Sequence, residues 1–137
     1  MSLVLDSSLT MAWIHRDETT RPVEEVFERL SQTGAWVPSP WRLEVANVLE
    51  MNVRRRRYAA NFRDGALSDL SFFPIQLDPE TNRRAWGATA SLAERHRLTL
   101  YDAAYLELAL RRGLPLATLD RELRAAAENQ SVQLLGV

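Results

Sequence analysis

Short apolar runs alternate with segments of helical periodicity along the whole chain, and this alternation most constrains the fold. Each run is short enough to be one strand, whereas the segments between the runs repeat apolar residues every three or four positions. Such a series predicts an α/β fold, in which a mainly parallel sheet has helices on both faces. We expect strands in SLVLD (2–6), AWVPSP (35–40), FPIQLD (73–78), LPLATLD (114–120) and VQLLG (132–136).

The segments between these runs predict the helices. In one of them Pro22 stands near the start and Gly34 at the end, which are the positions that these residues favour. With 137 residues, the chain is expected to form a single domain over 1–137. In chain order, we expect helices over 7–17, 21–34, 40–55, 57–71, 79–97, 101–112 and 121–128.

The composition excludes several classes of site. The chain has no cysteine, which removes disulfides and thiolate metal sites and fits a cytoplasmic location. All 17 basic residues are arginine, and without lysine the chain has neither a P-loop nor a Schiff-base amine. The first residues form no basic signal region, and no stretch approaches the roughly 18 apolar residues of a membrane span.

Three acids stand where strands or helices are expected to begin or end. Asp6 and Asp120 end predicted strands, and open parallel sheets bind ligands at the carboxyl ends of their strands. Asp102 heads a line of a predicted helix that is otherwise apolar. Each acid also has a structural interpretation, because Asp after a strand is a common helix cap and Thr99 with Asp102 matches a capping box.

A fourth acid, Glu44, lies within the apolar face of the helix predicted over 40–55. At about 100° per residue, its position falls between the lines of Val48 and Met51. It is too far inside the helix to be a cap, and an unpaired buried carboxylate is costly. Glu44 therefore has to be neutral, paired with an arginine, or bound to a metal ion.

The four acids considered together favour a metal site. In one crevice they would repel one another and raise one another's pKa values unless cations neutralised them. Oxygen ligands of this kind select Mg²⁺ or Mn²⁺. Such an ion orients a phosphate and lowers the pKa of an attacking water, so the acids predict metal-assisted hydrolysis of a phosphodiester.

Four blocks of the sequence carry a resemblance to a known family. They are VLDSSLTMAWI, WRLEVANVL, LTLYDAAYLELALRRGLPLATLDREL and VQLLG, which follow the expected order and span nearly the whole chain. Together they resemble the PIN-domain ribonucleases of the VapC toxin type. The resemblance implies a flavodoxin-like fold with three layers, and a catalytic, metal-binding site made of Asp6, Glu44, Asp102 and Asp120. Asp6 and Asp102 would be the most direct ligands of the ion.

The resemblance also implies supporting residues around these acids. Thr118 matches a Ser or Thr two positions before the last acid, where it would orient a carboxylate or a water. Ser7 matches the small hydroxyl residue after the first acid. Asn47 matches an Asn three positions after Glu44 and would hold that side chain in place.

The resemblance further implies a function and partners. The chain would be a Mg²⁺- or Mn²⁺-dependent endoribonuclease, the toxin of a toxin–antitoxin pair, acting on tRNA or rRNA. It would form a homodimer, and a VapB-like antitoxin would block its site. The alternatives are a non-catalytic PIN-like module that binds RNA or protein, and a metal-dependent phosphatase, which the missing lysine disfavours.

Several basic residues allow more than one interpretation. The run Arg54, Arg55, Arg56 and Arg57 is a candidate RNA-binding cluster, because arginine pairs with phosphate and stacks on unpaired bases. The same run suits a solvated helix end, whose negative dipole favours cations. For Arg111 and Arg112, at the end of another helix, we favour that structural role. The spacing of His15 and His96 pairs neither with a catalytic triad nor with a metal set.

Overall fold

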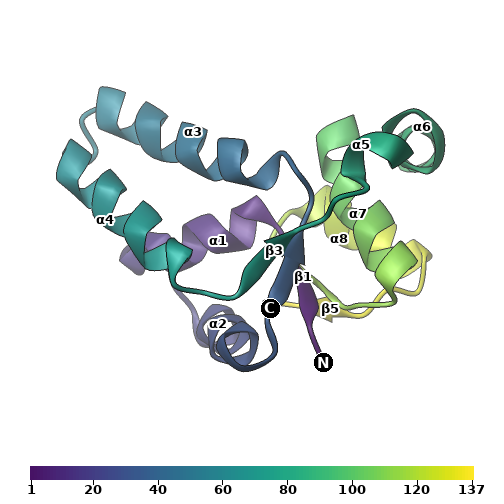
Figure 1. Cartoon of the computed structure of the whole chain (residues 1–137), viewed down its shortest axis with the longest axis horizontal. Helices are drawn as coiled ribbons and strands as arrows, with labels where there is room; N and C mark the ends of the chain where they lie inside the picture. Colours follow the sequence, from purple (N-terminus) through teal and green to yellow (C-terminus); the bar gives the residue numbers. More distant parts are fainter.

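Five short strands form one parallel sheet at the centre of the computed structural model, which describes residues 1–137 (Figure 1). Their order across the sheet is β3-β2-β1-β4-β5, and every neighbouring pair is parallel. Each predicted apolar run supplies one strand, which confirms the predicted α/β fold. The strands are β1 (Leu3–Leu5), β2 (Ala35–Val37), β3 (Ile75–Leu77), β4 (Leu116–Ala117) and β5 (Leu134–Leu135).

Helices lie on both sides of this sheet. In Figure 1, α1 to α4 lie on one side and α5 to α8 on the other. The first group is α1 (Ser7–Ile14), α2 (Arg21–Thr33), α3 (Trp41–Arg54) and α4 (Ala60–Ser71), with the short 3-10 turn η1 (Arg16–Glu18). The second group is α5 (Thr81–Arg84), the π-helical turn η2 (Ala85–Thr89), α6 (Ala90–His96), α7 (Leu100–Arg112) and α8 (Arg121–Asn129). None of these helices combines the length and the apolar character that crossing a membrane requires.

The order of the strands creates a switch point between β1 and β4. The chain moves outward from β1 to β2 and β3, then returns and adds β4 and β5 on the other side of β1. In an open α/β sheet, such a reversal leaves a crevice at the carboxyl ends of the two strands. The ladder continues to that end, because the Asp6 N–H donates to the Ala117 carbonyl at 3.0 Å. The residues that follow β1 and β4 are therefore brought together.

Three predicted helices differ in their bounds from those in the structure. Helix α4 begins at Ala60 rather than Arg57, because the chain turns after α3 through Arg56, whose φ is 59°. The helix expected over 79–97 is divided into α5, η2 and α6. The first helix ends at Ile14, with η1 as a separate turn after it. These helix differences leave the predicted acids in place, but β4 ends at Ala117, so Asp120 lies three residues beyond the strand and caps α8.

The core lies between the sheet and its helices. All three residues of β1 have no exposed surface, as expected for a central strand between two helical layers. Helix α7 is buried without interruption over Ala103–Ala109. Because a helix packed along its length cannot shift easily, α7 holds its first turn, which contains Asp102, in a fixed place.

A buried hydrogen bond fixes the start of α3 to α1. The Trp41 indole N–H donates to the Thr10 hydroxyl at 3.2 Å, and this hydroxyl donates to the Asp6 carbonyl at 2.9 Å. Trp41 is itself buried. Helix α3 therefore begins beside the end of β1, and Glu44 in its first turn is brought to the same crevice.

Asp78 connects the edge of the sheet at β3 to the end of α7. Its buried carboxylate accepts hydrogen bonds from Arg111 at 3.1 and 2.6 Å and from Arg112 at 3.1 Å. Arg111 also pairs with Glu107 at 2.8 Å. Burial alone would raise the pKa of Asp78, but the hydrogen bonds from the two arginines outweigh it and hold the pKa below its ordinary value. The two arginines lie at the end of α7 as predicted, but the prediction of a solvated helix end was wrong, because both are largely buried against Asp78.

We predict that Asp78→Ala lowers the free energy of unfolding by about 3 kcal/mol or more, because two guanidinium groups lose their shared buried partner. As a control, Glu80→Gln should cost less than about 1 kcal/mol, since Glu80 is partly exposed and lies 3.6 Å from Arg111. Urea unfolding of both variants measures the difference. Equal losses would show that the buried cluster does not anchor β3.

Candidate active site

Asp6 is the buried centre of a polar site at the end of β1. It is 2% exposed. Its carboxylate accepts hydrogen bonds from the Ser7 N–H at 2.8 Å and from the hydroxyls of Ser8 and Thr118, both at 2.6 Å. Thr118 directly follows β4, so the pairing of β1 with β4 supplies this contact. Asp6 also caps the start of α1, and it therefore combines the structural role and the polar surroundings expected of a site residue.

Glu44 reaches the same place from α3 and is held by hydroxyl groups. The Tyr105 hydroxyl donates to Oε1 at 2.9 Å, and the Ser7 hydroxyl donates to Oε2 at 3.2 Å. The Ser7 hydroxyl also lies 3.4 Å from Asp6 Oδ1 and so connects the two acids. The arginine partner that the sequence left open does not form. Asn47 is exposed and makes no hydrogen bond to Glu44, so its supporting role stays a prediction.

Asp102 and Asp120 stand at the starts of α7 and α8. The Thr99 hydroxyl accepts the Asp102 N–H at 3.1 Å, so the first half of the predicted capping box forms. The Asp120 carboxylate accepts the Glu122 N–H at 3.3 Å and caps α8. The Asp120 N–H donates to the Thr118 hydroxyl at 3.1 Å. Thr118 thereby contacts Asp6 through its hydroxyl proton and Asp120 through its oxygen.

Electrostatic coupling joins the four acids into one group. Burial raises the pKa of Asp6, and the charge of Asp120 adds to this effect. Burial likewise raises the pKa of Glu44, with further contributions from Asp6 and Asp102. The pKa of Asp102 is raised by burial and then by the charges of Asp6 and Asp120. All four predicted acids therefore lie close enough to repel one another.

These acids fit a hard divalent cation by their chemistry, but they do not form a closed set of ligands. Oxygen donors of this kind suit Mg²⁺ and Mn²⁺, and a cation would relieve the repulsion among the acids. No group of three or more His, Asp or Glu side chains is arranged to hold a metal ion. The Asp6 oxygens are instead engaged by hydroxyl and amide donors. An ion bound here would therefore use one or two of the carboxylates and complete its coordination with water or a substrate phosphate.

The arginine run divides at the end of α3. Arg54 pairs with Glu50 at 3.1 Å on an exposed helix surface, and the next two arginines are exposed. Arg57 lines an open groove that also contains Ser8, a hydrogen-bond partner of Asp6. RNA binding by the run stays a prediction, and Arg57 is the member that shares a groove with the acidic site.

Neither histidine joins the acids. His15 lies 2.9 Å from both Glu18 Oε2 and the Tyr58 hydroxyl, through its two different ring nitrogens. His96 lies 2.9 Å from the Gln130 amide nitrogen. Both rings therefore make local contacts outside the acidic site.

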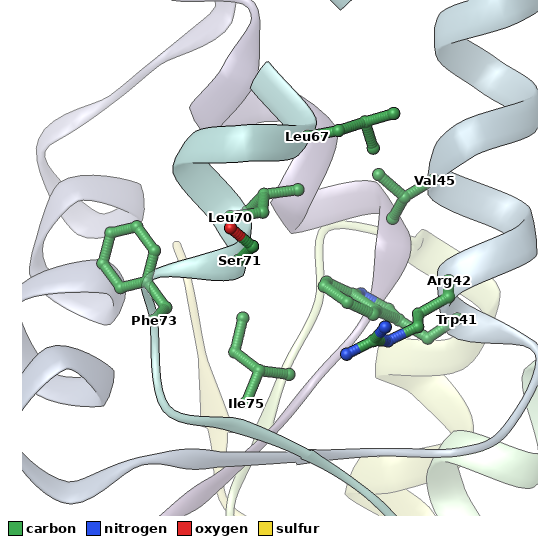
Figure 2. Close-up of a pocket in the computed structure, with 8 residues that line it drawn as sticks. All are labelled: Trp41, Arg42, Val45, Leu67, Leu70, Ser71, Phe73 and Ile75. Carbon is green, nitrogen blue, oxygen red and sulfur yellow. The ribbon is translucent and has the colours of Figure 1, made fainter. Parts of the chain in front are cut away.

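A separate apolar cavity of about 240 Å³ lies between α3 and α4. Figure 2 shows side chains from both helices, from β3 and from the segment that connects α4 to β3, arranged around this space. None of the four acids lines it, so it offers no ligand for a cation. Its lining residues are Trp41, Arg42, Val45, Leu67, Leu70, Ser71, Phe73 and Ile75.

Two residues of the polar site escaped the sequence analysis. Ser8 donates to Asp6 and accepts the Leu119 N–H at 3.0 Å, so it contacts the segments that follow both β1 and β4. Tyr105 is fully buried and donates to Glu44. Its signal was its position, one helical turn after Asp102 on the same side of α7.

The four acids also lie within the part of the chain that matches known proteins. The sequence model of the PIN domain matches residues 3–129. Ribonuclease VapC3 of Pyrobaculum aerophilum is 30% identical over 123 residues, which are 90% of this chain and 92% of the relative. The crystal structure of PAE2754 from Pyrobaculum aerophilum has the same fold, with a TM-score of 0.63 and 22% identity, over 92% of this chain and 84% of that chain. The chain therefore belongs to the PIN domain family, as its four sequence blocks predicted.

Proposed function

We propose that this chain is a metal-dependent endoribonuclease that acts as the toxin of a toxin–antitoxin pair. The observation that carries the proposal is the group of four mutually repelling acids at the switch point, with Asp6 buried at its centre. The similarity to Ribonuclease VapC3 supports the choice of reaction. By the same similarity, we propose a VapB-like antitoxin as partner, a homodimer, a cytoplasmic location, and tRNA or rRNA as substrate.

The charge of the site explains why such a reaction would need a cation. An RNA phosphate is negative, and it would be repelled by the four carboxylates, of which Asp6, Glu44 and Asp102 already have raised pKa values. Asp6 and Asp102 would hold Mg²⁺ or Mn²⁺ most directly, and Glu44 and Asp120 would complete the site. When bound, such an ion supplies phosphate orientation, a lower pKa of the attacking water and neutralisation of developing charge.

The protein's own groups would position these acids. The hydroxyls of Ser8 and Thr118 hold the Asp6 carboxylate, and the Tyr105 hydroxyl holds Oε1 of Glu44. Glu44 Oε2 has only the longer bond from Ser7. Burial raises the pKa of Glu44, and we assign to Glu44 the acceptance of a proton from an attacking water.

A non-catalytic RNA-binding module is the second candidate. It is favoured by the absence of a closed set of metal ligands. It is disfavoured by the cost of keeping four carboxylates together, since a protein that only binds an anion gains nothing from this repulsion.

We predict that Asp6→Asn lowers RNA cleavage by more than about 100-fold, beyond the roughly 10- to 100-fold typical of residues that only orient a ligand. Asp69→Asn, the same chemical change at an exposed position of α4, should leave cleavage unchanged. Induced expression followed by gel analysis of total RNA compares the two with the wild type. Growth arrest and discrete fragments should accompany the wild type and Asp69→Asn alone. Intact RNA with all three folded proteins would contradict the ribonuclease proposal.

The raised pKa of Asp102 leads to a prediction about pH. Below its ordinary pKa of 3.8, Asp102 is neutral in both the folded and the unfolded chain, so Asp102→Asn should not change stability. As pH rises through the raised folded pKa, the wild type alone loses stability. The variant should therefore become more stable than the wild type at about pH 7, by about 0.5 kcal/mol, since partial exposure keeps the effect small. Thermal unfolding across this pH range, in a chelator, measures the difference. A constant difference would contradict the coupling of Asp102 to its neighbours.

Metal binding should also appear as stabilisation. We predict that Mn²⁺ at about 100 times its dissociation constant raises the free energy of unfolding of the wild type by about 2.7 kcal/mol. Asp6→Asn should lose most of this gain, and Asp69→Asn should retain it. Thermal unfolding at increasing Mn²⁺ concentration tests this prediction. A melting temperature that does not change with Mn²⁺ concentration would favour the non-catalytic module.

A further inference from the structure

An open groove of about 410 Å³ begins beside the acidic site and follows α1. One end contains Ser8 and Leu119, and Ser8 donates directly to the Asp6 carboxylate. The other end contains His15 and Arg57. Since His15 lies seven positions after Ser8 along α1 and its C-cap, the groove extends about 10 Å from Ser8 along this helix. The groove is therefore adjacent to the acidic site through Ser8, although none of the four acids lines it.

The floor and the far end of this groove differ in chemistry. Met11, Ala12 and Val48 supply apolar surface from α1 and α3. Arg57 supplies a cation at the far end, and Asn52 supplies a neutral polar group. An apolar floor with a guanidinium at one end suits a ligand that has a flat apolar part and an anionic part, as a nucleotide does.

The backbone after α3 places Arg57 at this groove. Arg56 adopts the left-handed conformation with φ of 59°. The Arg57 N–H donates to the Asn52 carbonyl at 2.9 Å, and the Arg56 N–H donates to the Val53 carbonyl at 3.0 Å. These two bonds are those of a Schellman motif, which reverses the chain at a helix end. All four arginines of the run are exposed, and Arg57 is the one that lines the groove.

The guanidinium of Arg57 keeps donors free for a ligand. Its ion pair with Asp17 is 3.4 Å long, and Asp17 is 77% exposed, so this contact is weak. Its other neighbour is His15 Nδ1 at 3.3 Å, but the same nitrogen lies closer to Glu18 Oε2, at 2.9 Å. When Nδ1 carries the ring proton, it donates a hydrogen bond to the Glu18 carboxylate, and Nε2 accepts a hydrogen bond from the Tyr58 hydroxyl. Nδ1 then has no lone pair that could accept a hydrogen bond from Arg57. Most of the five guanidinium N–H groups therefore lack a strong acceptor.

We propose that this groove binds the nucleotide next to the scissile phosphate of an RNA strand, with Arg57 pairing with that nucleotide's phosphate. The ribose and base would lie over Met11, Ala12 and Val48. This inference rests on the proposed function, because the acids beside Ser8 define where the strand is cut. Glu18 also lines this end of the groove and pairs with His15. Asp17 restrains Arg57 until a phosphate, which offers two oxygens to the planar fork, replaces this weak pair.

The test measures binding apart from cleavage. The probe is a short fluorescein-labelled single-stranded RNA of random sequence, followed by anisotropy in a chelator with the Asp102→Asn protein. Adding Arg57→Gln should weaken binding about tenfold and reduce the slope of log affinity against log salt by about 0.7, the value for one phosphate contact on a single strand. Arg57→Lys should keep this slope and lose part of the affinity, because lysine lacks the planar fork.

The matched control is Arg16→Gln. Arg16 is exposed, lies between His15 and Asp17, and does not line the groove, so its loss changes the net charge equally without removing a contact. Equal weakening by Arg16→Gln and Arg57→Gln would show a diffuse charge effect and overturn the subsite. Unchanged RNA affinity in Arg57→Gln would also overturn the subsite. Arg57 would then be available to pair with an acidic group of a protein partner. Absence of RNA binding by the Asp102→Asn protein at low salt would also overturn it. If Arg57→Gln does not weaken RNA binding but the wild type still cuts RNA, the subsite is overturned and the cleavage proposal stands. If RNA binding depends on Arg57 but the wild type does not cut RNA, the subsite is supported in a non-catalytic module.

Discussion

The parallel pairing of β1 with β4 is the constraint on which the candidate site depends. These strands are neighbours in the sheet although more than a hundred residues separate them in the chain, and their ladder extends to the Asp6 N–H and the Ala117 carbonyl. Because both strands run in the same direction, their next residues meet at one edge. Asp6 and Thr118 are thus in contact through a 2.6 Å hydrogen bond. Asp120 follows Thr118 by two residues and so reaches the same edge. Glu44 and Asp102 are brought there by α3, which packs against α1, and by α7, which packs against β1.

Burial of Asp6 shows how the fold accommodates an acid at its centre. Desolvation disfavours the charged form, and two hydroxyls and one backbone N–H compensate only in part, since the pKa stays above its ordinary value. Asp78 is the contrasting case, because two arginines surround it and its pKa falls. Of the three buried acids, Asp78 and Glu107 pair with arginine, whereas Asp6 has no cationic partner. Asp6, the buried acid without a cation, lies at the switch point. A positively charged ligand would therefore stabilise the charged form of an acid most at this place.

The sequence predicted the parts of this arrangement that depend on local pattern. Strand ends and helix starts can be recognised from short runs and caps, so Asp6, Asp102 and Asp120 were placed correctly on their elements. Glu44 was recognised because helical periodicity put it on an apolar face. The partners of these acids could not be predicted in the same way. Tyr105 donates to Glu44 across 61 residues, and such contacts depend on how α3 and α7 pack, which no local pattern determines.

The arginine run illustrates the same limit at the scale of a single turn. Four identical side chains in sequence predict one basic cluster, but a non-glycine residue in the left-handed region separates them. Glycine normally marks that position in a Schellman motif, and an arginine there gives no warning of the reversal. The turn places one of these exposed arginines, Arg57, at the groove beside the acidic site, whereas the other three do not line it. The acids repel anions, whereas Arg57, at the groove end about 10 Å from Ser8 along α1, attracts them. This arrangement favours a ligand with several phosphates, because one phosphate can pair with Arg57 while another phosphate of the same chain reaches the acids.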